Sequence, residues 1–252
     1  MNRLKKIFII LLGLWLVLLT SVVTVVAVNQ PNPVPRAVLG MSWGLIILWV
    51  IIGGSLMYRL RDPIRRIVLR IPLPWQIKFV LFVTGLALLE EVITTLMTNL
   101  APAFGVAVGE AYIVASTNFL DVVFFHSIIN FVGPFVFWAL VLRRYDFRPF
   151  ATFLIFGLSG LLAEVMFSGP QHFAEFGLWI FIYGLMIYLP TYCLPDATTR
   201  GKNGRAARRP GWYLYILMIF LPVIFVPLFA WIPYVVNPAH PQPSHFAPMQ
   251  MN

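Results

Sequence analysis

Residues 77–99 read IKFVLFVTGLALLEEVITTLMTN, and this stretch decides what kind of fold the chain can adopt. It is long enough to cross a bilayer, since a membrane helix needs roughly 20 predominantly apolar residues. Two adjacent acids, Glu90 and Glu91, nevertheless stand in its second half. An ionisable group inside a membrane span is costly and usually faces a bundle interior or a polar cavity. The stretch therefore predicts a membrane helix with a polar inner face.

The composition of the whole chain supports a membrane protein. Its 252 residues are 60% hydrophobic and 11% charged, with a mean hydropathy of +0.86. A soluble domain is about 45–50% apolar and about 25% charged, so this chain has too few polar residues to cover a soluble globule. Its one cysteine, Cys193, excludes an intramolecular disulfide framework and any CxxC metal or redox motif.

Further apolar runs predict an all-α, polytopic membrane helix bundle with seven transmembrane helices. The predicted spans are about 7–28, 37–58, 77–99, 119–142, 150–168, 174–194 and 212–236. We expect residues 1–236 to form one domain. Residues 237–252 are rich in Pro and polar residues, which predicts a disordered extracytoplasmic tail.

The net charge of +9 is distributed in a pattern that gives an orientation. Seventeen of the 18 Lys and Arg residues fall at every second connection, in the ranges 3–6, 59–78, 143–148 and 200–209, and the remaining one is Arg36. The positive-inside rule then places the N-terminus in the cytoplasm and the C-terminus outside a cell membrane. We expect anionic lipid headgroups at these basic loops, and no nucleic acid as a partner. Segment 59–72 mixes Arg with aliphatic residues and predicts a short amphipathic helix along the inner interface.

Most of the acids lie away from the basic loops, and three ionisable groups share one predicted depth. Glu91 and Glu164 each lie 14 residues into a rising span, about 21 Å from its inner boundary. His126 lies on a descending span, about 10 Å below the outer boundary. In a hydrocarbon core about 30 Å thick, these three positions are at the same level.

Helical spacing predicts that these groups face a common interior. Each group lies on a helix face with small or polar residues. Glu91 lies on one face with small residues and threonines of 84–98, and Glu164 lies on one face with Gly157 and Gly160, which we call the Glu164 stripe. His126 lies on one face with Asn130 and Gly133. Small and polar residues line contacts between membrane helices. The candidate site residues are therefore Glu91, His126, Asn130 and Glu164.

Other polar and aromatic positions are expected to be structural. Asp121 and Glu175 stand near helix starts, where an acid favours the helix dipole, and Glu110 is expected in an outer loop. His172 is expected in a turn. Trp179 and Tyr183 are expected in the interfacial aromatic belt.

Two families of intramembrane proteases share short motifs with the chain. Glu90-Glu91 followed by His126-x-x-x-Asn130 resembles parts of the CAAX-protease (Abi) motifs, but Thr94 or Thr95 replaces the expected Arg, and no second His lies within a predicted span. Gly157-Leu-Ser159-Gly160 with the same His126 motif resembles rhomboid proteases, but residues 174–236 contain no His to partner the Ser. Both resemblances imply intramembrane proteolysis. They cover too little of the chain to assign a family.

Three classes of function remain open. In an intramembrane hydrolase, Glu91 would act as general base, with His126 and Asn130 orienting it or stabilising an oxyanion. A metal-dependent version would use Glu91, His126 and Glu164 to hold a divalent metal such as zinc or iron. In an ion- or proton-coupled transporter of small solutes, Glu91 and Glu164 would bind a cation or exchange protons. In a non-catalytic subunit, the cluster would join helices within a complex with other membrane subunits.

Overall fold

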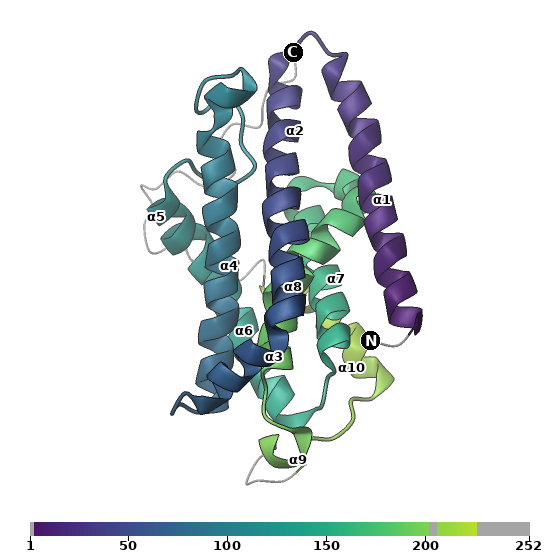
Figure 1. Ribbon diagram of the computed structural model, residues 1–252, viewed down its shortest axis with the longest axis vertical. Helices are drawn as coiled ribbons and strands as arrows, with labels where there is room; N and C mark the ends of the chain where they lie inside the picture. Colours follow the sequence, from purple (N-terminus) through teal and green to yellow (C-terminus); the bar gives the residue numbers. More distant parts are fainter. Residues whose placement is uncertain (1–2, 202–205, 226–252) are drawn as a thin grey trace.

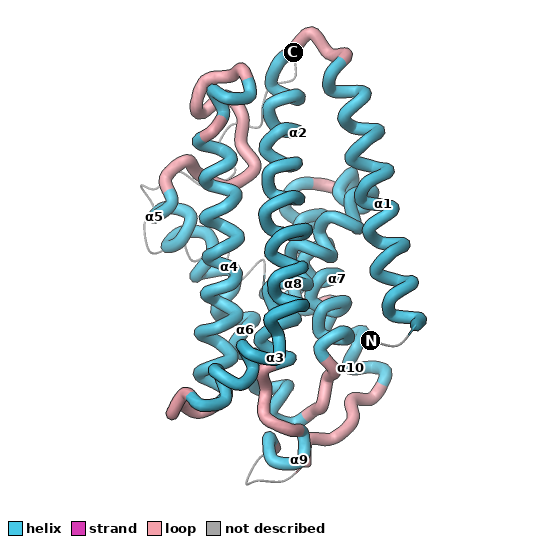
Figure 2. Tube along the Cα trace, viewed as in Figure 1, coloured by secondary structure: helices cyan, strands magenta, loops and turns pink. Residues whose placement is uncertain are grey.

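The computed structural model describes residues 3–201 and 206–225, and within these ranges it is helical with no β-strand. Two isolated bridges, Val108 with Ala111 and Tyr145 with Arg208, are the described β-type pairings. Six helices are long and apolar enough to cross a membrane: Arg3–Val28, Pro33–Arg70, Trp75–Asn99, Phe119–Arg144, Pro149–Ser168 and Pro170–Tyr192. The all-α, multi-pass architecture predicted from the sequence is therefore found, and short loops join the helices (Figure 2).

Several of these spans are built from more than one element. The first span is α1 (Arg3–Val28), and the second joins α2 (Pro33–Leu45), the π-helix η1 (Ile46–Gly53) and α3 (Gly54–Arg70). The third is α4 (Trp75–Asn99), followed by the short 3-10 helix η2 (Ala101–Phe104). The fourth joins α5 (Phe119–Val122), the π-helix η3 (Val123–Ser127) and α6 (Ile128–Arg144). The fifth is α7 (Pro149–Ser168), and the sixth joins the 3-10 helix η4 (Pro170–Glu175) to α8 (Phe176–Tyr192). The short α9 (Ala197–Arg200) and α10 (Trp212–Ile219) follow.

The predicted seventh span is described only in its first part. It begins with α10 (Trp212–Ile219), turns at Phe220 and is helical again over 221–225. The rest of that span, 226–236, and the predicted tail, 237–252, lie outside the described residues. Seven spans, a single domain over 1–236 and an outer C-terminus therefore stay predictions.

The basic groups gather at one end of the bundle, which we call the basic end. The start of α1 and the connections α3–α4, α6–α7 and α8–α9 all lie at the lower end of Figure 1. The α1–α2 turn lies at the opposite end (Figure 1). This arrangement matches the alternating charge pattern of the sequence, while the side of the membrane that the basic end faces stays a prediction.

The predicted amphipathic segment 59–72 is helical as far as Arg70, but it continues the second span instead of standing apart from it. The helix extends without interruption from Pro33 to Arg70, 38 residues, and Pro63 lies inside it. The α3 part of this helix bends away from the direction of α2 and toward the lower end of α4 (Figure 1). Proline removes a helix hydrogen bond and favours such a bend. The Nζ atom of Lys78 donates to the Val68 carbonyl at 2.9 Å and to the Ile71 carbonyl at 3.2 Å, which closes the end of α3.

The α7–α8 hairpin forms the centre of the packing because glycines let the two helices approach closely. A Cβ atom on Gly157 would lie 2.7 Å from the Ile180 carbonyl oxygen, and one on Gly184 would lie 2.7 Å from the Phe153 carbonyl oxygen. Small residues at such contacts are the usual basis of helix association in membranes. Gly169, at φ 107°, forms the tight turn between the two helices, where the sequence predicted one. The hairpin thereby fixes the faces of α7 and α8 that meet α4 and α6.

Candidate functional site

Glu91 lies buried in the middle of the bundle and is held by α4 and by the fourth span. Glu91 is 4% exposed, and the Ser127 hydroxyl donates a hydrogen bond to its Oε1 atom at 2.8 Å. The Thr94 hydroxyl, one turn along α4, lies 3.3 Å from Oε2 and 3.1 Å from the Glu91 backbone carbonyl, which share its one proton. The Nε2 atom of His126 lies 3.8 Å from Oε1. Two helices therefore supply the polar surroundings that a buried carboxylate requires.

A π-helical turn brings two consecutive residues, His126 and Ser127, to the same carboxylate. Both lie in η3 (Val123–Ser127), which interrupts the α-helix between α5 and α6. Neighbouring residues of a regular α-helix point about 100° apart, because the helix has 3.6 residues per turn. A π-turn changes this register locally, and such turns are frequent at functional sites. The local helix geometry thus explains why both side chains meet Glu91.

Asn130 fixes the orientation of the His126 ring. The Nδ2 atom of Asn130 lies 3.4 Å from Nδ1 of His126, one helical turn earlier. With the amide donating to Nδ1, the ring proton is on Nε2, the atom that faces Glu91. The His126 side chain is 34% exposed, whereas that of Glu91 is 6% exposed. His126 is therefore the more accessible member of the pair.

Glu164 joins the same cluster from the α7–α8 hairpin. The Tyr183 hydroxyl of α8 donates a hydrogen bond to Oε1 of Glu164. Glu164 is half-buried and interacts electrostatically with His126. Glu90, 6% exposed, lies on α4 next to Glu91, and its carboxyl group would be repelled by ionised Glu91 and Glu164. Three carboxyl groups thus share the interior of the bundle with the His126 imidazole.

A second polar group lies at the turn between α7 and α8. The Nδ1 atom of His172 lies 2.6 Å from Oε2 of Glu175, and the Trp179 indole donates to the same oxygen at 2.9 Å. Glu164 interacts electrostatically with His172 and Glu175. His172, Glu175 and Trp179 thus form a hydrogen-bonded group of their own at this turn.

The structure adds partners to several residues that were interpreted as structural. Glu175 stands at a helix start, as expected, as the N-cap residue of α8, and its carboxylate binds His172 and Trp179 instead of a backbone amide. Trp179 and Tyr183 bind carboxylates, and their place in an aromatic belt stays a prediction. The expected helix start at Asn118 is found, because its side chain accepts from the Leu120 amide at 3.0 Å. Glu110 lies in a loop, as expected, and accepts from the Ala107 amide at 2.7 Å.

The predicted metal set of Glu91, His126 and Glu164 stays a prediction. Over residues 3–201 and 206–225, no three His, Cys, Asp or Glu side chains lie close enough together to hold a metal ion. Glu91 and His126 approach each other, whereas Glu164 reaches them only through its electrostatic interaction with His126. The separation follows from the Tyr183 hydrogen bond, which holds Glu164 on the α7–α8 side.

Three polar residues of the two groups were not predicted as site residues: Ser127, Tyr183 and His172. Ser127 follows His126 directly and was not singled out, because α-helical spacing places it on a different face. Tyr183 resembled an interfacial aromatic residue, and His172 a turn residue. A useful signal was the small residue Gly160, which lies on the Glu164 stripe and leaves space for the Tyr183 ring.

Comparisons with protein-family models, curated proteins and solved structures give no match to this chain.

Proposed function

We propose that the protein is a proton-coupled membrane transporter of small solutes, in which the cluster of Glu90, Glu91, Glu164 and His126 binds and releases protons. The observation that carries this proposal is the charge imbalance of the cluster. Three carboxyl groups share a low-dielectric interior, and the basic side chains described near them are two imidazoles, His126 beside Glu91 and His172, which is already paired with Glu175. Each uncompensated charge there costs several kcal/mol, so the cluster must hold protons to exist.

The order of the contacts supports a relay toward one end of the bundle. His172 and Glu175 lie at the α7–α8 turn, away from the basic end. Glu164, on α7, is close enough to both His126 and His172 for their charges to act on its carboxyl group. His126 in turn faces Glu91. Groups that can donate and accept protons thus follow one another from the turn to the middle of α4, as in the proton relays of pumps and transporters.

Proton entry into reconstituted vesicles tests the proposal. The vesicles contain a pH-sensitive dye, and a potassium diffusion potential drives protons inward. We expect faster acidification with the wild-type protein than in protein-free vesicles, and a protein-free rate with Glu91→Gln. Glu110→Gln is the matched control, because it removes a carboxyl group from an outer loop. Equal rates for wild type and Glu91→Gln would contradict the proposal.

One contact favours a second candidate, an intramembrane hydrolase. The hydrogen bond from the Ser127 hydroxyl to Glu91, at 2.8 Å, is the arrangement in which a carboxylate accepts the proton of a nucleophilic serine. A fluorophosphonate probe distinguishes the two candidates, because it reacts covalently with activated serines. Labelling that is lost in both Ser127→Ala and Glu91→Gln would favour the hydrolase. Absence of labelling in wild type would exclude it.

A further inference from the structure

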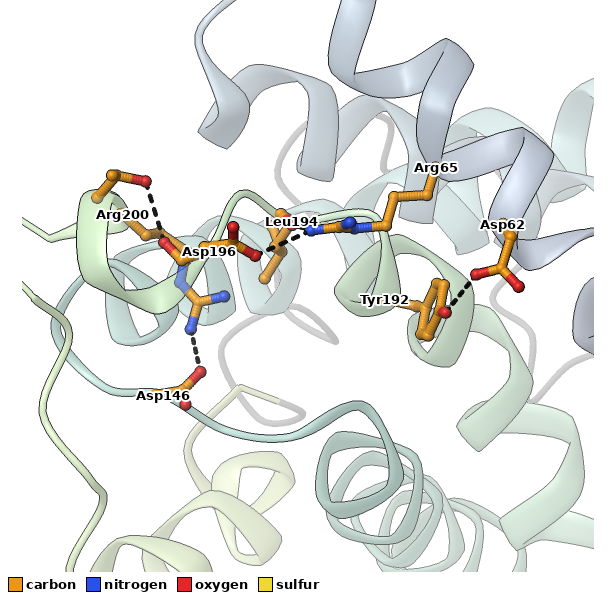
Figure 3. Close-up of polar contacts among 8 residues, drawn as sticks. Asp62, Arg65, Asp146, Tyr192, Leu194, Asp196 and Arg200 are labelled. Atoms are coloured by element: carbon orange, nitrogen blue, oxygen red, sulfur yellow. Dashed lines mark hydrogen bonds and ion pairs between the residues drawn. The ribbon is translucent and has the colours of Figure 1, made fainter. Parts of the chain in front are cut away.

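The chain that leads into the predicted seventh span is anchored at the basic end of the bundle. The Asp146 amide donates to the Arg208 carbonyl at 2.8 Å. The side chain of Asp146 also lies 2.7 Å from the buried guanidinium of Arg200 (Figure 3). The Tyr215 ring of α10 packs on the Phe147 ring, with 5.1 Å between the ring centroids. Helix α10 therefore starts from a fixed position beside the α6–α7 connection.

The helix is interrupted after α10, and a proline explains the interruption. Helix α10 ends at Ile219, and the chain turns at Phe220 before it becomes helical again. Pro222 has no amide hydrogen, so the Met218 carbonyl, four residues earlier, lacks its usual helical donor. The Val223 amide donates to the Phe220 carbonyl at 3.1 Å, one residue short of the α-helical acceptor Ile219. Two successive carbonyl groups thus leave the helical pattern of hydrogen bonds.

A serine of α7 binds both of these carbonyl groups. Ser159 is 3% exposed, and its Oγ atom lies 2.8 Å from the Met218 carbonyl oxygen and 3.1 Å from that of Ile219. A hydroxyl group has one proton, so the two carbonyl oxygens share it. Serine side chains of neighbouring helices are one of the means by which membrane proteins satisfy the backbone groups that proline frees. The interruption is thus held by one side chain, which can release either carbonyl group while α10 stays folded.

The part of the chain beyond the interruption packs on another helix. The Phe225 ring lies edge-to-face on the Phe137 ring of α6, with 5.9 Å between the ring centroids. Helix α6 also carries Asn130, whereas α7, which carries Ser159, also carries Glu164. The interruption therefore contacts both helices that bring polar side chains to the proton-binding cluster.

We propose that this interruption is a hinge, at which residues 221–225 change direction relative to the anchored α10, and that the Ser159 hydrogen bond holds the arrangement seen here. Hinges consist of a few residues at the ends of elements, which absorb the change in backbone angles. Transporters commonly contain such discontinuous helices near their binding sites. A role of the hinge in transport rests on the proposed function, whereas the hinge motion itself does not.

Distances between spin labels in the full-length protein, reconstituted in lipid, test the motion. Cys193→Ser removes the native thiol. One label is attached at Leu81→Cys on α4, and the second at either Leu217→Cys, before the interruption, or Val223→Cys, beyond it; all three side chains are exposed. We expect one distance for the 81–217 pair and two for the 81–223 pair. These distances are measured without a proton gradient, so they do not depend on proton transport, which the acidification assay tests separately.

Two variants test the assigned residues. Pro222→Ala returns an amide donor to the Met218 carbonyl and should reduce the two distances of the 81–223 pair to one. Ser159→Ala should change the ratio of the two populations about fivefold, the effect of one modest hydrogen bond. Ser168→Ala is the matched control, because it removes an exposed hydroxyl at the end of α7 and should leave the ratio unchanged. A single 81–223 distance in otherwise wild-type protein, or identical distributions with and without Pro222→Ala, would overturn the proposal.

Discussion

Gly160→Ala is a substitution whose effect can be worked out from the structure. A Cβ atom at Gly160 would lie 2.0 Å from Cδ2 and 2.1 Å from Cγ of Tyr183. Carbon atoms in contact are about 3.5–4.0 Å apart, so the ring must move by about 1.5 Å. Tyr183 donates its hydroxyl to Glu164, and the movement would weaken this hydrogen bond. The substitution therefore acts on both the helix packing and the polar cluster.

Overpacking of this kind costs about 1–3 kcal/mol, and loss of the buried hydrogen bond adds about 1–3 kcal/mol. Thermal unfolding in detergent, followed by circular dichroism, measures the combined effect. Gly85→Ala is the matched control, because no atom lies within 4 Å of a Cβ at that helical position. It should leave stability unchanged or raise it by up to about 1 kcal/mol, since alanine favours helix.

A double substitution tests whether Tyr183 is the cause. In a Tyr183→Ala background the two closest contacts of the new Cβ disappear, because both are with ring atoms, and only the contact with Cβ of residue 183, at 2.7 Å, remains. Gly160→Ala should then cost less than in wild type, which a double-mutant cycle detects as coupling. Equal costs in both backgrounds, or an effect of Gly160→Ala no larger than that of Gly85→Ala, would refute the reasoning.

Three further predictions follow from other contacts. Tyr183→Phe removes the donor to Glu164 and should lower the free energy of unfolding by about 1–3 kcal/mol, measured by denaturation in detergent. The control Tyr213→Phe should have little effect, because Tyr213 is 55% exposed. Asp146→Asn removes the charge that binds buried Arg200 and should lower the free energy of unfolding by about 1.5–3 kcal/mol in the same assay. The control Asp62→Asn should cost less than about 1 kcal/mol, because the Asp62 side chain is 67% exposed. Equal costs would argue against a structural role for Arg200. Cys193 is 3% exposed, and burial raises the pKa of its thiol to about 12, so the reactive thiolate is scarce at neutral pH. Maleimide labelling at pH 7 should be slow in the folded protein and fast after denaturation, and rapid labelling of the folded protein would contradict this.

The spans were predictable because their physical cause is local in the sequence. The stretch 77–99 corresponds to α4 (Trp75–Asn99), since membrane thickness fixes the length of an apolar helix. Shared depth and helical spacing placed Glu91 near His126, because the rise per residue is constant. The extent of the second helix, to Arg70, was missed because α3 continues past the apolar run as a basic helix.

The partners of the site residues were harder to predict, because they depend on contacts between helices. The π-turn of η3, which brings Ser127 to Glu91, has no simple sequence signal. The contact between Tyr183 and Glu164 depends on the close approach of α7 and α8 at Gly160. For the same reason, helical spacing alone does not decide whether the helices bring the predicted metal set together.

The most direct test of the central claim, that Glu91 belongs to a proton-holding cluster, is infrared difference spectroscopy of the purified protein between acidic and alkaline pH. The C=O stretch of a protonated carboxyl group reports each group that gains or loses a proton. The account predicts a buried carboxylic-acid signal that loses intensity in Glu91→Gln, shifts in His126→Gln, and is unchanged in Glu110→Gln. A Glu91→Gln spectrum identical to that of wild type would contradict it.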